Sequence, residues 1–320
     1  MEPNKTFSIW ALILSCVLWF GGTSPNTLLA QEPMPIIDMH LHTGLPHEIP
    51  EGSPALCRPE PCRGEGHAIV DPMENLKSSL EQMDRYNIVK AFLSGTDLKA
   101  VKQWTQSAPD RFVPSPFILE AGPAELDRLK ADYSAKTFRG IGEIGVQLHG
   151  VPPNDPSLEP YYELAEELDL PVLIHTLGIG PYMPHFSSAA GNPLLLEEVL
   201  KRHPKLRLFV ENAGFPFKEE MIAIMYQYPQ LYADVSTISW VIPRTAFYDY
   251  LEAFVRAGLA KRLMFGSDQM VWPKKIGAAV RSIREAPFLS KGQKRDILYN
   301  NAARFLRLGA DEIAVHHSRN

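Results

Sequence analysis

A regular alternation of short apolar runs with longer amphipathic segments, from residue 35 onward, is the feature that most constrains the fold. The apolar runs predict eight strands, at residues 36–43, 89–94, 112–118, 140–146, 171–176, 206–212, 231–236 and 262–267. Amphipathic segments between and after them predict helices, at 71–86, 98–107, 124–134, 158–168, 193–202, 218–228, 244–257, 274–286 and 291–308. Because this alternation indicates parallel strands with helical crossovers, the chain is predicted to be an α/β protein, a single (β/α)8 TIM barrel.

The first thirty residues have the order of a secretory signal peptide. Lys5 precedes an apolar run at residues 7–20, and a polar segment then leads to a small residue, Ala30. A bilayer-spanning helix needs about 20 residues, so this run favours a cleaved leader over an anchor. We therefore expect residues 1–30 to be removed, residues 31–320 to form the barrel, and the mature protein to be exported to the periplasm or medium without stable membrane insertion.

The cysteines are interpreted through this expected export. Cys16 resembles a lipoprotein cleavage site, but the apolar run continues past it, which disfavours lipid anchoring. Cys57 and Cys62 are five residues apart and have no second cysteine pair with which to form a zinc cluster. In an oxidising compartment such a pair predicts a disulfide in a surface loop.

Net charge bears on the partners of the protein. The formal charge is −5 and the pI is about 6.1, so no basic field favours nucleic acid. We expect a small-molecule substrate, and a homo-oligomer is compatible with the sequence.

The first predicted strand carries Asp38-Met-His40-Leu-His42. Side chains two residues apart on a strand share a face, with Cα atoms roughly 6–7 Å apart. Two imidazoles can then converge on one metal ion with bonds of about 2 Å. The alternative is a pair of incidental histidines on a core strand.

Three further residues of ligand type lie at or near the carboxyl ends of other predicted strands. Glu143 lies on the fourth strand, His175 ends the fifth, and Asp268 follows the eighth. Barrel enzymes build their active sites at this end of the strands, so the sequence predicts a metal site there.

These residues also lie within segments that resemble the amidohydrolase superfamily of metal-dependent hydrolases. The segments are IDMHLHT, HTLG at His175, HPKLRLFVENAGFP, FGSDQ at Asp268 and YNNAARFL. They look most like the branch that contains aminocarboxymuconate semialdehyde decarboxylase. The resemblance implies that His40, His42, His175 and Asp268 bind a divalent metal, usually zinc, which lowers the pKa of a bound water to about 7. It assigns catalytic roles to Asp268 as proton acceptor and to His175 as ligand or carbonyl polariser.

Two positions depart from that family pattern. Asn212 stands where the sixth strand normally carries a histidine, and it is expected to contact substrate instead. Glu211 could replace the histidine only if the strand were bulged, because neighbours on a strand face opposite sides. Glu143 resembles the metal-bridging glutamate of TatD-type deoxyribonucleases. One ion is favoured and two remain compatible with the sequence.

The stretch RGIGEIGV also fits a dinucleotide-binding pattern through Gly140, Gly142 and Gly145. Such a loop must open directly into a helix, but three prolines follow within ten residues and forbid one. We therefore expect these glycines to make room inside the barrel.

The sequence predicts a metal-dependent hydrolase that cleaves a small amide, ester or lactone. His67 and Trp240, in loops predicted to follow the first and seventh strands, are further candidates for substrate contacts. A metal-dependent nonoxidative decarboxylase of a small carboxylic acid is the alternative enzyme. A non-catalytic binding protein with an impaired metal site is the alternative outside enzymes.

Overall fold

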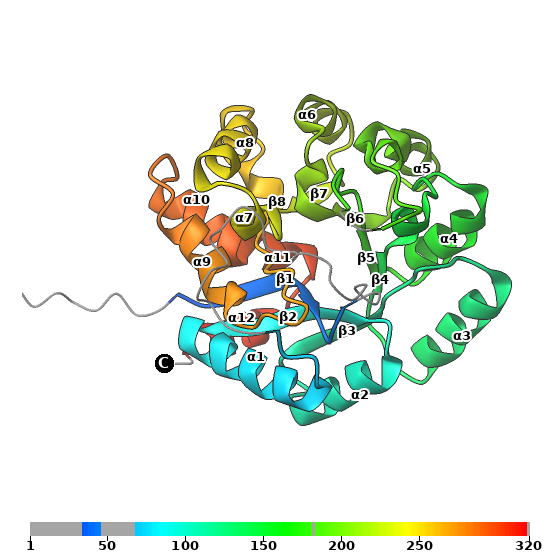
Figure 1. Ribbon diagram of the computed structural model, residues 1–320, viewed down its shortest axis with the longest axis horizontal. Coiled ribbons are helices and arrows are strands. Elements are labelled where there is room, and N and C mark those ends of the chain that lie inside the picture. The colour runs from blue at the N-terminus through cyan, green and yellow to red at the C-terminus, as the bar shows by residue number, and fades with distance from the viewer. Residues whose placement is uncertain (1–33, 46–67, 181–182, 319–320) are drawn as a thin grey trace, which may run out of the picture. The chain divides into compact units, whose positions relative to one another are not determined.

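The computed structural model describes residues 34–45, 68–180 and 183–318. Its strands form two parallel hydrogen-bonded ladders, one of three strands and one of five (Figure 1). In chain order they are β1 (Ile36–His42), β2 (Ile88–Gly95), β3 (Phe112–Pro116), β4 (Ile141–Ile144), β5 (Pro171–Ile174), β6 (Arg207–Val210), β7 (Tyr232–Asp234) and β8 (Leu263–Met264). The order within each ladder follows the order in the chain, as crossovers between neighbouring parallel strands produce.

Two isolated bridges join the ladders into a closed ring. Leu41 of β1 pairs with Gln269, beyond β8, and Ile118, beyond β3, pairs with Ile144 of β4. Backbone hydrogen bonds support the first junction, since the Asp268 amide donates to the His40 carbonyl over 2.7 Å. The structure therefore has the (β/α)8 architecture that the sequence predicts.

Helices surround the strands, and their apolar faces pack on the outside of the barrel (Figure 1). They are α1 (Pro72–Tyr86), α2 (Leu98–Ser107), α3 (Pro123–Ser134), α4 (Glu159–Glu167), α5 (Glu197–Arg202), α6 (Lys218–Gln227), α7 (Ile238–Val241), α8 (Arg244–Arg256), α9 (Lys275–Arg284), α10 (Lys291–Arg295), α11 (Asn301–Phe305) and α12 (Ala310–Ser318). The short helices α7 and α12 are additions to the helices that the sequence predicts. No helix within the described ranges is long and apolar enough to span a bilayer.

The interior of the barrel is filled by large rings, and glycines leave space for them. Phe92 of β2 and Phe209 of β6 meet edge to face with ring centroids 5.5 Å apart. A Cβ at Gly140 would lie 2.6 Å from the Phe92 ring, and a Cβ at Gly145 would collide with the ring of Phe117. These two glycines therefore give room inside the barrel, as expected. A single-turn 3-10 helix, Val146–His149, begins directly after Gly145 in place of the α-helix of a dinucleotide-binding loop.

Gly142 is constrained by its backbone as well as by its surroundings. Its φ is +100°, and an added Cβ would collide with the carbonyl oxygen of Leu173 on the neighbouring strand. We expect Gly142→Ala to lower the free energy of unfolding by about 2–4 kcal/mol in urea denaturation. Gly309→Ala, where an added Cβ meets nothing within 4 Å, should stay within about 0.5 kcal/mol of the wild type. Equal stabilities for the two variants would contradict this account of Gly142.

The main difference from the predicted elements is that the strands end earlier. β5 ends at Ile174, β6 at Val210 and β8 at Met264, so the polar residues that follow them lie in turns. The predicted signal peptide, Cys16, the Cys57–Cys62 disulfide and His67 fall outside the described residues.

Candidate metal centre

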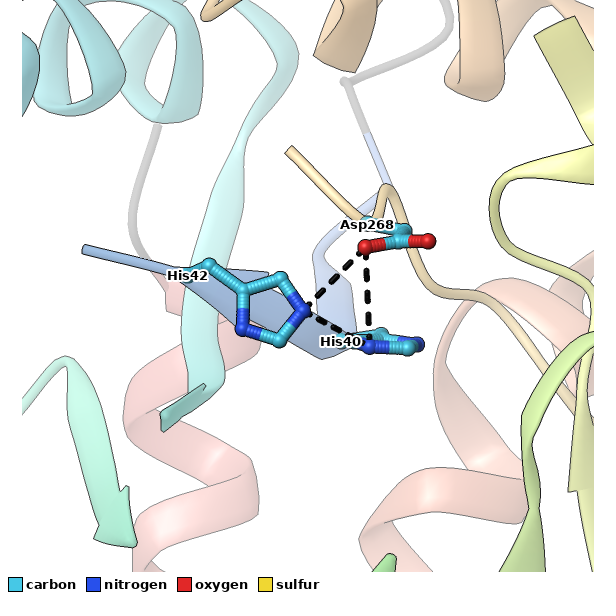
Figure 2. Close-up of side chains that lie close together, drawn as sticks. All are labelled: His40, His42 and Asp268. Atoms are coloured by element: carbon cyan, nitrogen blue, oxygen red, sulfur yellow. Dashed lines mark hydrogen bonds and ion pairs between the residues drawn. The ribbon is translucent and has the colours of Figure 1, made fainter. Parts of the chain in front are cut away.

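His40 and His42 of β1 and Asp268 beyond β8 converge on one point (Figure 2). The two imidazole Nε2 atoms are 2.9 Å apart. Asp268 Oδ1 lies 3.1 Å from Nε2 of His42 and 3.6 Å from Nε2 of His40. All three side chains are buried. Ligands of one tetrahedral ion with bonds of about 2.0–2.2 Å lie roughly 3.3–3.6 Å apart, so the 3.6 Å separation fits such an ion and the other two are shorter.

The other nitrogen of each imidazole is held by the protein. His40 Nδ1 lies 3.0 Å from Asp234 Oδ2 on β7 and 3.1 Å from Ser236 Oγ. His42 Nδ1 lies 2.9 Å from Ser94 Oγ on β2. When the ring of His40 is neutral and its proton on Nδ1 is bound by Asp234, the lone pair lies on Nε2 and is directed at the point of convergence. A carboxylate behind a metal-ligating histidine has this effect in many metal sites.

Glu143 of β4 contacts both sides of the cluster. Its Oε2 atom lies 2.9 Å from Nε2 of His40 and 3.2 Å from Nε2 of His42. Its other oxygen, Oε1, lies 2.6 Å from Nδ1 of His175. The fourth strand thus brings a carboxylate between the paired histidines and the residue that follows β5.

The prediction for Glu211 was wrong. Glu211 was expected to face the site only if the sixth strand were bulged. Instead β6 ends at Val210, and Glu211 begins a turn in which Asn212 has a φ of 50°. Strand alternation therefore does not apply to it, and Glu211 Oε2 lies 2.5 Å from Nδ1 of His175.

Asn212 and Trp240, two predicted substrate contacts, are both buried. The Asn212 amide nitrogen donates to Glu211 Oε1 over 2.6 Å, and its amide oxygen accepts from the backbone of Ile238 over 3.0 Å. The Trp240 indole nitrogen donates to the carbonyl of Ser267 over 2.7 Å. The hydrogen bonds that the structure describes for these two side chains therefore all go to other groups of the protein.

Asp268 is held by its backbone and by a neighbour. Its φ is 48°, in the left-handed region that Asp and Asn adopt more readily than most residues. Thr237 Oγ1 donates a hydrogen bond to Oδ2. Among the described residues Oδ1 has no hydrogen bond of acceptable geometry, and the same is true of Nε2 of His175.

Buried charges dominate the electrostatics of the cluster. Burial opposes charging of His42, but the adjacent carboxylates of Asp268 and Glu143 outweigh it and raise its pKa to about 9. Burial likewise opposes charging of His175, whereas Glu211 and Glu143 raise its pKa to about 10. Asp268 and Asp234 overcome burial at His40 and raise its pKa well above 6.5.

The pKa values of the carboxyl groups in the cluster shift in different directions. Burial, followed by the charge of Glu143, raises the pKa of Glu211 to about 8. Burial also raises the pKa of Asp38, to about 6, against hydrogen bonds from Ser267 and the His40 amide. At Glu143 burial is outweighed by hydrogen bonds from the three histidines, which hold its pKa well below 4.5.

The donors fit a divalent metal. Imidazole nitrogens and carboxylate oxygens are the ligands that zinc and similar ions take, and the donor atoms of two buried groups lie within 4.8 Å of one another. One group is His40, His42 and Asp268, and the other is His40, Glu143 and Glu211. Imidazoles and carboxylates buried this closely need protons or cations between them to offset their lone pairs and charge.

Metal binding should therefore release protons. The raised pKa values mean that the metal-free histidines hold protons at pH 7, and a metal must displace them. Raising the pH removes this competition, so metal affinity should increase from pH 6 until the pH exceeds the pKa values of about 9 and 10. Calorimetric titration in buffers of different ionisation enthalpy measures the protons released, and release of none at pH 7 would contradict the assignment.

Several supporting residues were missed by the sequence interpretation, namely Ser94, Asp234, Ser236 and Thr237. Asp234 and Ser236 did carry a signal, because they lie two residues apart at the end of the seventh predicted strand. Ser94, at the end of the second predicted strand, carried a weaker signal in the sequence.

Solved structures share this fold at low sequence identity. A TIM-barrel protein from Bordetella bronchiseptica is 19% identical, with 86% of this chain and 99% of that chain covered and a TM-score of 0.62. A protein of Acinetobacter baumannii described as a probable 2-pyrone-4,6-dicarboxylic acid hydrolase is 18% identical, with 86% and 100% covered and a TM-score of 0.59. The 2,6-dihydroxybenzoate decarboxylase of Rhizobium is 17% identical, with 86% and 99% covered and a TM-score of 0.57.

A family model is more specific than these likenesses. Among curated proteins, none matches the chain significantly. The amidohydrolase model, however, matches residues 37–308, from the strand that carries the paired histidines to the residues just before α12. Since that match spans most of the sequence, this chain belongs to the amidohydrolase family of metal-dependent enzymes.

Proposed function

We propose that the protein is a hydrolase that activates water at a divalent metal, most simply zinc, to cleave a small amide, ester or lactone. The observation that carries this proposal is the convergence of His40, His42 and Asp268 on one buried point, with Glu143 beside them. A divalent metal bound there would lower the pKa of a water molecule and polarise a substrate carbonyl.

The residues of the chain supply the remaining steps. Asp268 has one oxygen bound by Thr237 and the other directed toward the histidines, so it can accept a proton from the attacking water. It can then pass that proton to the leaving group. His175 Nε2, which has no hydrogen-bond partner among the described residues, can donate to a substrate oxygen.

A metal-dependent nonoxidative decarboxylase is the second candidate. The barrel is shared with the Rhizobium 2,6-dihydroxybenzoate decarboxylase and with the 5-carboxyvanillate decarboxylase of Sphingomonas paucimobilis. At these identities the likeness concerns the fold, so the choice of reaction rests on product analysis.

A substrate panel separates the two reactions. The zinc-loaded protein is incubated with amides, esters, lactones and carboxylated aromatic acids in water labelled with ¹⁸O. Hydrolysis places the label in the product acid, whereas decarboxylation releases carbon dioxide and leaves the product unlabelled. A metal content below about a tenth of an ion per chain after zinc supplementation would refute both enzymes and favour a binding protein.

The location of the protein is a separate proposal. The leader-like residues 1–30 support export, and Cys57 and Cys62 support a disulfide in the exported protein. Mass spectrometry of the secreted protein should show Gln31 as the first residue and a mass two hydrogens below that of the reduced chain. Retention of residues 1–30 would contradict this proposal without affecting the assignment of the metal site.

A further inference from the structure

We propose that the amino ends of three barrel strands form a separate binding site for a small organic dianion, a phosphate monoester or a dicarboxylate. The strands are β5, β6 and β7, which begin at Pro171, Arg207 and Tyr232. The candidate metal donors lie at the opposite, carboxyl ends of the strands. The inference therefore concerns a different end of the barrel and does not depend on the proposed hydrolase.

The site is a surface hollow of about 610 Å³ between these strand ends and the residues that follow α11. Its charged lining residues are Lys205, Arg207, Arg304, Arg307, Glu166 and Asp169. We call it the basic hollow. Binding sites for small molecules have volumes of roughly 300–1,000 Å³, so the basic hollow has room for an organic molecule as well as for an inorganic ion.

The charge of the basic hollow is opposite to that of the whole chain. With all groups ionised it carries four positive and two negative charges, whereas the formal charge of the chain is −5. Both carboxylates already bind protein groups. Glu166 accepts from the backbone amide of Lys205 over 2.7 Å, and Asp169 pairs with Arg207 and Arg307. The remaining excess of positive charge matches a ligand with two negative charges.

Two of the arginines are held in place by the protein. Only 15% of the Arg207 side chain is exposed, and its Nε donates to Asp169 Oδ1 over 2.9 Å. Arg304 donates from Nε to the hydroxyl of Tyr232 over 3.2 Å and from Nη2 to the carbonyl of Lys261 over 2.6 Å. Because both guanidinium groups are fixed before a ligand arrives, less entropy is lost when one binds.

The basic hollow also has donors that the described protein groups do not use. Among the described residues, neither Nη1 of Arg304 nor Nζ of Lys205 has a hydrogen-bond acceptor. The side chain of Arg307 donates from Nη1 to Asp169, which leaves its other nitrogens for a ligand. Guanidinium groups bind the oxygens of carboxylate and phosphate in pairs, and this geometry defines the proposed class of ligand.

The basic residues repel one another when no anion lies between them. Burial lowers the pKa of Arg207, and the charge of Arg307 lowers it further against the opposing effect of Asp169. An anion bound between these guanidinium groups would replace the repulsion by attraction. The arrangement therefore favours an occupied hollow over an empty one.

Calorimetric titration at constant ionic strength tests the site with two probes, glycerol phosphate and succinate, and with acetate as the monovalent comparison. We expect one dianion to bind per chain with a Kd below about 1 mM and to raise the unfolding temperature, and we expect acetate not to saturate. Lys205→Glu and Arg307→Gln should each weaken binding at least about tenfold. Lys99→Glu, which changes the charge of an exposed residue of α2 in the same way, is the matched control and should bind as the wild type does.

The two probes distinguish the sources of the dianion. Tighter binding of glycerol phosphate supports a phosphate monoester, and tighter binding of succinate supports a dicarboxylate. Failure of both to saturate the wild type overturns the inference, as does equal affinity in the wild type and Lys205→Glu, because the anion would then bind elsewhere. Lys205 is exposed, so this variant should fold, and thermal unfolding without ligand checks that it does. None of these results alters the assignment of the metal centre.

Discussion

Replacing His40 by alanine will remove the metal and abolish turnover. Its Nε2 atom lies 2.9 Å from donor atoms of both His42 and Glu143, and its Nδ1 atom is held by Asp234. The substitution therefore deletes a ligand and leaves a buried carboxylate without its partner. Loss of a residue that only supports a ligand costs 10–100-fold in metal affinity, so we expect at least about 10³-fold in affinity and in kcat/KM.

Metal analysis and steady-state kinetics on an identified substrate measure both effects. His203→Ala is the matched control, because His203 is also buried but pairs with Glu159 and Glu166 on α4. It should keep its metal, and thermal unfolding shows whether each variant is folded. A folded His40→Ala protein with near-native metal content would exclude His40 as a ligand.

The second large effect is expected from Asp268→Asn. The left-handed φ of 48° at this position suits Asn, so the substitution changes the charge of the side chain with little effect on the backbone. The amide can no longer accept a proton from water, and we expect kcat to fall by about 10²–10⁴-fold. Metal content should decrease much less than in His40→Ala.

The role of Asp268 is tested by measuring metal content and turnover rate separately in the same variant. A variant that retains stoichiometric metal and loses turnover supports proton transfer by this carboxylate. Near-native turnover would show that another group accepts the proton. The pH dependence of any residual rate then identifies that group.

The order of the strands was predictable because each apolar run is short and separated by an amphipathic helix. Helix α2, at Leu98–Ser107, even has the bounds that the sequence predicts. The pairing of His40 with His42 was predictable for the same reason, since period-two geometry places both on one face. Both predictions depend only on patterns local in the sequence.

The parts of the site that could not be predicted from the sequence depend on contacts between distant strands. The position of Glu211 depends on where β6 ends, and a shift of two residues decides which of Glu211 and Asn212 faces the cluster. Strand ends are set by tertiary hydrogen bonds, not by composition. Asp234 acquires its role only because barrel closure brings β7 within 3.0 Å of His40.

The junction between β1 and the segment after β8 has a consequence for how the protein is assembled. The metal donors His40 and Asp268 are joined across it, with the amide of Asp268 bound to the carbonyl of His40. A growing chain lacks Asp268 until most of its length has been made, so the group of His40, His42 and Asp268 cannot form before the eighth strand has been synthesised. We therefore expect metal to bind this group only after synthesis is nearly complete.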